Sequence, residues 1–164
     1  MSPEEFIKYK SEFRKGVRAK IAEYSAEELV RSDEQIADRF LSLPEIGNCK
    51  RVWAYVNYGK EISTMKILSY FRKAGIYVAV CWDFPPDRFP QAGEIIIVPG
   101  LTFDENGYRI GKGGGYYDRL IAASPDSFTV GLARDGLVVG EVPKEAHDQR
   151  VQCLVTETKI TRYQ

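Results

Sequence analysis

The sequence predicts an α/β protein with three layers (α/β/α), in which helices cover both faces of a mostly parallel central sheet. Segments with the apolar spacing of helices alternate with short apolar runs rich in β-branched and aromatic side chains, which is the order expected of βαβ units. The chain has 164 residues, a length typical of one domain. We therefore expect a single domain over residues 1–164.

Composition narrows the classes of function. Hydrophobic residues make up 44% of the chain and charged residues 28%, which indicates a folded core. The 23 basic and 23 acidic side chains cancel, whereas general nucleic-acid or membrane binders carry a basic excess. No apolar run approaches the length of a membrane helix, and the polar N-terminus is unlike a signal peptide. We expect a cytoplasmic protein with no nucleic-acid or membrane partner.

The first predicted helix begins at a capping box formed by Ser2 and Glu5 and runs to about residue 24. Lys10, Arg14 and Arg18 follow one another at intervals of four residues, so the three cations share one face that drifts slowly around the helix. This face is either solvated or holds an anion. Beside it runs an apolar stripe made of Phe6, Phe13, Val17, Ile21 and Tyr24.

A second capping box, Ser25 with Glu28, begins a helix that we expect to end near residue 42. Its apolar face carries Leu29, Ile36 and Phe40, and nothing in this helix indicates chemistry.

The next unit is a buried strand at residues 51–56, a loop, and a helix that Ser63 or Thr64 caps and that ends at Lys73. Glu61 lies in the loop. Because ligands of open α/β sheets bind beyond the carboxyl ends of the strands, Glu61 lies where a functional carboxylate would lie. The helix dipole also favours a glutamate in a first turn, so both roles stay open.

Two further strands are predicted at residues 76–82 and 95–98, separated by a Pro-rich connector (residues 83–90). Later in the chain we expect a short helix at residues 116–123, a strand at 128–133, a turn at 134–136, and a last strand at 151–156.

The segment between residues 95 and 120 contains the ingredients of an anion site. Its three consecutive glycines can adopt positive φ angles and let backbone N–H groups approach a ligand. The helix expected at Tyr116 adds unpaired N–H donors, and Arg109 and Lys112 add positive charge. Together they form an anion cradle; the alternative is a Gly-rich turn that only closes a βα unit.

This segment resembles the signature of the 5-formyltetrahydrofolate cyclo-ligase family, also called 5,10-methenyltetrahydrofolate synthetases. The positions that stand in register are Val98, Pro99, Gly100, Phe103, Asp104, Gly107, Arg109, Gly111, Gly113, Gly115, Tyr116, Tyr117, Asp118 and Arg119. The resemblance implies a NagB/RpiA/CoA-transferase-like fold. It also implies the cyclisation of 5-formyltetrahydrofolate to 5,10-methenyltetrahydrofolate with ATP and Mg²⁺, releasing ADP and phosphate.

The resemblance also implies a role for individual residues. The implied nucleotide-binding residues are Lys10, Arg14, Arg18, Arg109, Gly111, Lys112, Gly113, Gly114, Gly115, Tyr116, Tyr117 and Asp118. The implied substrate-binding residues are Val56, Glu61, Lys112, Gly113, Gly114, Gly115 and Tyr116. Arg109, Tyr116 and Tyr117 are the implied catalytic residues, and Asp118 and Asp148 the implied magnesium ligands, which suits a cation that prefers carboxylate oxygens. A Walker A motif is absent, so a two-sided cationic grip takes its place.

The chain departs from the family pattern in two places. Family members carry a longer segment, with further strands and a motif containing Glu-Pro, where this chain passes almost directly from Trp82 to the strand at residue 95; Trp82, Phe84 and Phe89 can replace part of that apolar wall. Gln152 stands where the family often has a second Asp. The single histidine, His147, fits acid–base work or a solvated loop.

Three functions therefore stay open. The first is a folate cyclo-ligase acting as a monomer on a small-molecule substrate. The second is a related ATP-dependent ligase or phosphotransferase with a different second substrate, which the shortened segment after Trp82 favours. The third is a non-catalytic nucleotide- or anion-binding protein.

Overall fold

The computed structural model describes residues 1–81 and 84–164. The proposed part of Trp82 in an apolar wall, and the end of the strand expected at residues 76–82, lie outside the described residues. None of the described helices is long and apolar enough to cross a membrane.

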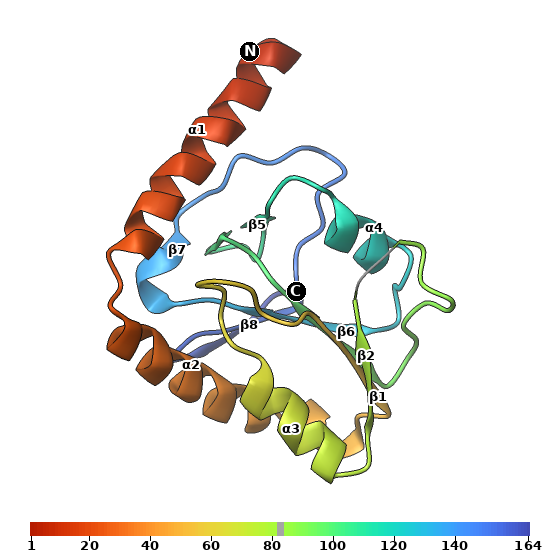
Figure 1. Cartoon of the computed structure of the whole chain (residues 1–164). Coiled ribbons are helices and arrows are strands. Elements are labelled where there is room, and N and C mark those ends of the chain that lie inside the picture. Colours follow the sequence, from red (N-terminus) through yellow and green to blue (C-terminus); the bar gives the residue numbers. More distant parts are fainter. Residues whose placement is uncertain (82–83) are drawn as a thin grey trace.

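The central sheet has six strands in the order β2-β1-β3-β6-β8-β9 (Figure 1). They are β1 (Arg51–Ala54), β2 (Tyr77–Val80), β3 (Glu94–Val98), β6 (Phe128–Leu132), β8 (Cys153–Val155) and β9 (Ile160–Arg162). Every neighbouring pair is parallel except β8 and β9, so the mostly parallel sheet is confirmed. The strand expected to be last is β8, and the antiparallel edge strand β9 follows it.

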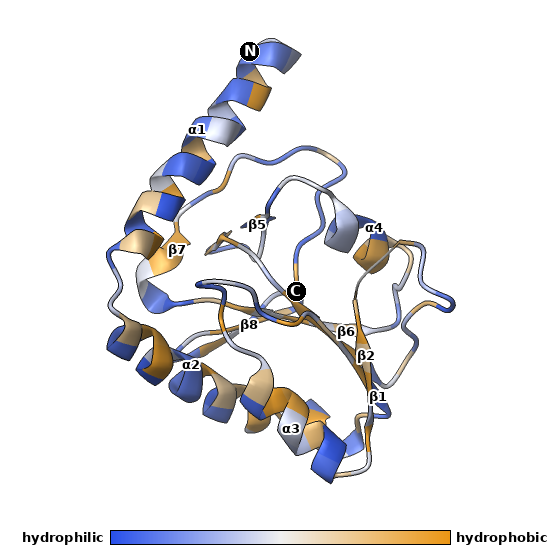
Figure 2. Cartoon of the chain, in the orientation of Figure 1, coloured by the Kyte–Doolittle hydropathy of each residue, from blue (hydrophilic) through white to orange (hydrophobic). Residues whose placement is uncertain are grey.

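One face of the sheet is covered by α2 (Ala26–Leu41), the short helix η1 (Pro44–Asn48) and α3 (Met65–Lys73). Figure 2 shows hydrophobic stretches on both α2 and α3, and their buried residues pack in the core. Ile36 and Phe40 of α2 meet Leu68 and Phe71 of α3 in the larger core cluster. This face confirms Ile36 and Phe40 as core positions of α2, whereas Leu29 is only half-buried.

The other face is covered by α4 (Tyr116–Ala122) and a second, three-stranded sheet with the order β5-β4-β7. Its strands are β4 (Thr102–Asp104), β5 (Arg109–Ile110) and β7 (Val138–Val139), the last preceded by the short helix η2 (Asp135–Leu137). The sequence did not indicate these three short strands. In the structure Asp104 is fully buried, and its carboxylate accepts hydrogen bonds from the backbone N–H groups of Asn106, Tyr108 and Val142.

The ring of Phe103 lies between two glycines that leave room for it. A Cβ on Gly100 would lie 2.9 Å from that ring and a Cβ on Gly131 would lie 2.6 Å from it. Both distances are shorter than a real contact, so the second sheet docks on β6 only because these positions are glycines.

The first helix, α1 (Pro3–Ala22), forms where it was predicted. It extends away from the body of the protein, with its N-terminal end projecting (Figure 1). Only Val17 of the predicted apolar stripe is buried, while Phe6, Phe13, Ile21 and Tyr24 are half-buried. The helix therefore lies along the edge of the molecule rather than in its core. Both capping boxes are present as predicted.

At the start of α3 the two predicted capping residues behave differently. Thr64 precedes the helix, but its side chain makes no cap hydrogen bond to it. The hydroxyl instead donates to the carbonyl of Tyr55 at 2.8 Å, and the hydroxyl of Ser63 accepts from the N–H of Met65 at 3.3 Å. The loop between β1 and α3 is thereby folded back on the end of β1.

Candidate active site

The candidate site lies at the carboxyl edge of the central sheet. From β1 the chain passes to β2 on one side and then returns to β3 on the other, so the strand order reverses between β1 and β3. Such a switch point is where open α/β sheets bind ligands. A cavity of about 320 Å³ lies here, lined by the loop after β1, the segment after β3, the end of β6 and the C-terminal part of α1.

The cationic face of α1 meets the Gly-rich segment (residues 111–115) beside this cavity. The Nε of Arg14 donates to the carbonyl of Gly111 at 2.9 Å, across 97 positions of sequence. A Cβ on Gly113 would lie 3.6 Å from the Nη2 of Arg14. Arg18, one turn further along α1, lines the cavity itself. The structure thus brings the two parts of the predicted cationic grip, the cations of α1 and the Gly-rich segment, next to each other.

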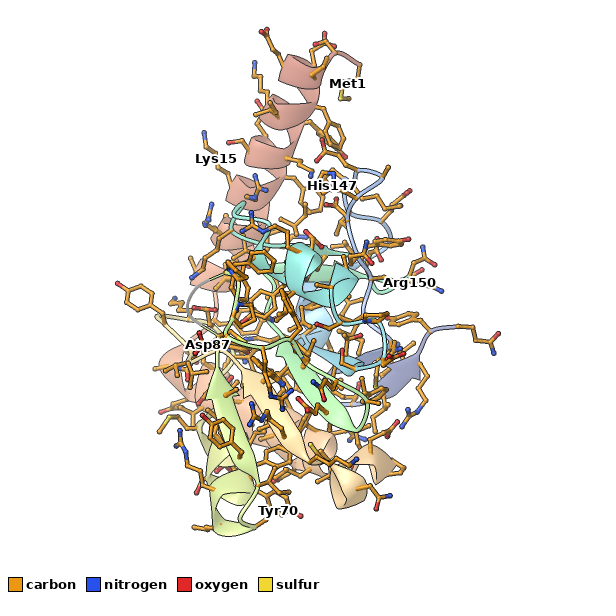
Figure 3. All side chains as sticks on the ribbon, turned by 90° about the vertical axis from the view of Figure 1, so that its right-hand side faces the viewer. Met1, Lys15, Tyr70, Asp87, His147 and Arg150 are labelled. Carbon is orange, nitrogen blue, oxygen red and sulfur yellow. The ribbon has the colours of Figure 1, made fainter. Side chains whose placement is uncertain are left out.

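Lys10 lies one turn before Arg14 and faces the loop at residues 143–150. Its Nζ is 3.0 Å from Glu145 Oε2 and 3.6 Å from Asp148 Oδ2. Figure 3 shows the loop that carries His147 on one side of α1 and Lys15 on the other side. The sequence did not indicate the carboxylate partners of Lys10.

Backbone conformation in the Gly-rich segment requires glycine at several positions. Gly113 and Gly115 have φ angles of 109° and 68°, which side chains rarely tolerate. A Cβ on Gly111 would lie 2.7 Å from the Nη1 of Arg109. Gly114 has open space around it. The segment therefore leaves its backbone accessible directly above Arg109.

Arg109 is a buried cation, with 7% of its side chain exposed. Burial lowers the pKa of Arg109, and the nearby Asp118 acts in the opposite direction. Its Nη2 is 3.6 Å from Asp118 Oδ1, which also accepts from the N–H of Gln149. Arg109 lies outside the cavity lining, and its buried Nε–H is a donor that no described residue satisfies.

Glu61 and Lys112 form an ion pair on the rim of the cavity. Lys112 Nζ lies 3.1 Å from Glu61 Oε1, and the same oxygen accepts from the N–H of Tyr58. Both side chains line the cavity. Val56, by contrast, is exposed and does not line it. The pair joins the loop after β1 to the Gly-rich segment.

The described part of the connector places aromatic rings against the start of α4. The ring centroid of Phe84 lies 5.9 Å from that of Phe89 and 6.0 Å from that of Tyr116. Tyr116 and Tyr117 lie 4.9 Å apart, and burial raises the pKa of Tyr117, so its hydroxyl stays protonated. These four rings form an apolar wall beside the Gly-rich segment.

A second set of contacts holds the connector to the sheet. The buried Glu94 accepts from Trp53 Nε1 at 2.7 Å and from Arg88 Nη2 at 2.8 Å. Burial alone would raise the pKa of Glu94, but these hydrogen bonds outweigh it and hold the pKa below its ordinary value.

The two predicted magnesium ligands have different surroundings. Asp118 is engaged by Arg109 and Gln149, whereas Asp148 lies with Glu145 and His147. Ligand atoms of these last three residues lie within 4.8 Å of one another. Carboxylates suit Mg²⁺, so both aspartates fit that role chemically. His147 is exposed, in agreement with a solvated loop histidine.

Arg134 is a candidate residue that the sequence assigned only to a turn. It is 2% exposed, lines the cavity, and contacts Ser32, Asp33 and the carbonyl of Lys60. Its position directly after β6, at the same edge as Glu61, is the one signal available in sequence. Its partners on α2 lie about a hundred positions away and carry no motif.

Comparison with known proteins agrees with the family resemblance of the segment at residues 95–120. The sequence model described as the 5-formyltetrahydrofolate cyclo-ligase family matches residues 85–157. The chain is 26% identical to a probable 5-formyltetrahydrofolate cyclo-ligase of Schizosaccharomyces pombe, over 77% of this chain and 84% of that protein. It is 25% identical to a 5-formyltetrahydrofolate cyclo-ligase of Escherichia coli, over 77% and 88%.

Solved structures agree with the fold. The 5,10-methenyltetrahydrofolate synthetase of Aquifex aeolicus superimposes with a TM-score of 0.78 and 29% identity, over 93% of this chain and 92% of that one. The synthetase of Mycoplasma pneumoniae gives a TM-score of 0.76 over 90% and 98% of the two chains. At 18% identity, the second match speaks for the fold alone.

Proposed function

We propose that this chain, which is similar to 5-formyltetrahydrofolate cyclo-ligases, converts 5-formyltetrahydrofolate to 5,10-methenyltetrahydrofolate, consuming ATP in the presence of Mg²⁺. The observation that carries this proposal is the meeting of Arg14 with the Gly-rich segment beside the switch-point cavity. We also propose that it acts as a single-domain monomer in the cytoplasm.

The proposed reaction has two steps. The formyl oxygen attacks the γ-phosphorus of ATP, so an O–P bond forms while the bond to ADP breaks. N10 then attacks the formyl carbon, the C–O bond to phosphate breaks, and phosphate and the N10 proton leave. Phosphoryl transfer depends on positioning and charge neutralisation rather than on a protein nucleophile, and we assign no protein base.

The residues of this chain supply the positioning from two sides. Lys10 and Arg14 would hold phosphate oxygens from the side of α1. Arg109, Lys112 and the exposed amides of the Gly-rich segment would hold them from the opposite side. Tyr116 and Tyr117 would contact the reacting formyl group or the pterin. Asp118 and Asp148 would hold Mg²⁺, which when bound neutralises negative charge on the phosphates.

A second candidate is a related ATP-dependent ligase or phosphotransferase with another second substrate. The short passage from β2 to β3 favours it, because the family carries further strands there. One assay separates the candidates: protein, Mg-ATP and 5-formyltetrahydrofolate are mixed, and methenyl absorbance is followed in the near ultraviolet. Turnover supports the cyclo-ligase, whereas ATP binding without turnover supports the second candidate. A chain that binds no ATP and gives no turnover would contradict both candidates.

Arg14→Ala is expected to weaken ATP binding by about 10- to 100-fold, because a charged hydrogen-bonding partner of the phosphates is lost. Isothermal titration with a non-hydrolysable ATP analogue measures this. Arg31→Ala, which removes an exposed arginine from α2, is the matched control and should bind as the wild type does. Unchanged affinity in Arg14→Ala would remove Arg14 from the site.

Asp118→Asn is expected to raise the magnesium concentration for half-maximal rate by about tenfold or more, because Mg²⁺ loses a charged ligand. The loss in rate, expressed as a change in activation free energy, should exceed the loss in the free energy of unfolding. Initial rates over a magnesium titration, beside thermal unfolding, test both statements. A magnesium dependence equal to that of the wild type would count against Asp118 as a ligand.

A further inference from the structure

Both backbone carbonyls that flank Glu61 are held by buried side chains. The carbonyl of Lys60 accepts from the Nη2 of Arg134 at 3.4 Å, and the carbonyl of Ile62 accepts from the hydroxyl of Tyr55 at 2.8 Å. The donors are only 2% and 6% exposed. Glu61 therefore lies on the cavity rim, but the peptides on either side of it are tied to the interior.

Arg134 is itself fixed from a different element. Its Nη1 donates to the hydroxyl of Ser32 at 2.6 Å and lies 3.0 Å from Asp33 Oδ1. Both partners belong to α2, so the planar guanidinium connects α2, the end of β6 and the loop after β1. A rigid fork with several donors can hold three partners in one geometry, which a lysine cannot do.

Tyr55 is equally constrained. Burial raises the pKa of Tyr55, so its hydroxyl stays protonated and remains a donor. Its own carbonyl accepts from the hydroxyl of Thr64, so the loop is tied at two points to the residue that directly follows β1. Tyr55 does not line the cavity, whereas Arg134 does. Tyr55 would therefore affect a ligand in the cavity only indirectly, through the position of the loop.

We propose that Arg134 and Tyr55 are positioning residues that hold the backbone of Glu61 so that its carboxylate faces the folate substrate. This inference rests on the proposed function, in which Glu61 contacts 5-formyltetrahydrofolate. Misplacing a binding group by about 1 Å can cost a factor on the order of 100, so loosening one flanking carbonyl should weaken substrate binding selectively. Among the described residues of the nucleotide side, Glu61 is paired only with Lys112, so the affinity for ATP should change far less than the affinity for the folate.

Steady-state kinetics on four variants test this proposal. Arg134→Met should raise KM for 5-formyltetrahydrofolate by about tenfold, and Tyr55→Phe, which removes one hydroxyl, by about threefold. The affinity for a non-hydrolysable ATP analogue should stay within about twofold of wild type in both. Arg39→Met is the control, because Arg39 also donates to a backbone carbonyl, that of Glu157, but lies outside the cavity lining; its KM should not change. The fourth variant, Glu61→Gln, serves as the background for a double-mutant cycle.

The cycle separates positioning from direct contact. If Arg134 acts through Glu61, then Arg134→Met should change KM by less than about twofold in the Glu61→Gln background. An equal increase in both backgrounds would overturn the proposal and mark Arg134 as a direct substrate contact. If Arg134→Met does not fold, Tyr55→Phe in the same cycle decides, since it removes a single oxygen.

Failure of the inference and failure of the proposed function give different results. A wild-type chain that neither binds nor converts 5-formyltetrahydrofolate removes both. Wild-type turnover, with Arg134→Met and Tyr55→Phe matching Arg39→Met in KM, removes this inference alone.

Discussion

Arg109→Lys is expected to lower kcat by about a thousandfold, because an arginine that stabilises the transferring phosphoryl group contributes roughly 10³–10⁵ to the rate. The guanidinium of Arg109 is buried below the Gly-rich segment and keeps an unpaired Nε. Lysine preserves the charge opposite Asp118 but places it at a single point, so the fork-shaped contact is lost. The loss should appear mainly in kcat, measured from methenyl absorbance at saturating substrates.

Arg119→Lys is the matched control for this experiment. Arg119 lies on the same short helix as Asp118 but is exposed and stacks its guanidinium on Phe84. We expect its kcat to stay near that of the wild type, and thermal unfolding should show that both variants are folded. A kcat for Arg109→Lys within about tenfold of wild type would contradict a role for Arg109 in the transition state.

Asp104→Asn is expected to lower the free energy of unfolding by about 3 kcal/mol, because a buried carboxylate that accepts three N–H groups is replaced by a group with an N–H₂ facing donors. At least one of the three backbone donors, from Asn106, Tyr108 or Val142, would lose its partner. For a chain of this size the change corresponds to a drop in Tm of roughly 6–12 °C.

Urea unfolding at neutral pH measures this change in free energy. Asp126→Asn provides the control, because Asp126 is an exposed side chain in the turn before β6 and exposed substitutions usually change stability by less than about 0.5 kcal/mol. Equal midpoints for the two variants would show that Asp104 does not hold the β4–β5 hairpin and the loop after β7 together.

The predictable parts of the fold depend on contacts that are close in sequence. Each capping box joins residues three positions apart, so Ser2 with Glu5 and Ser25 with Glu28 could be identified directly. Five of the six strands of the central sheet were predicted, and β9 was not. The second sheet could not be predicted, because strands of two or three residues are too short to show an alternating pattern.

Helix α1 shows a different limit. Its apolar spacing predicts an amphipathic helix but does not say whether the apolar face packs in the core or along an edge. In the structure Val17 alone reaches the core, while Phe6 and Phe13 are half-buried. The same helix confirms the expected approach of Arg14 to the Gly-rich segment.

The site was predictable as far as the family pattern extends. Pairing Arg14 with Gly111 depended on that pattern, since 97 positions separate them. The partners of Lys10 at Glu145 and Asp148, and those of Arg134 on α2, depend on tertiary structure alone. The roles of the site residues in binding and catalysis remain predictions.

The packing of Phe103 links three positions that are distant in sequence. Its aromatic ring occupies the volume that side chains at residues 100 and 131 would otherwise fill, so the three positions must vary together during evolution. Among homologues, alanine or a larger residue at position 131 should therefore coincide with a smaller side chain at position 103.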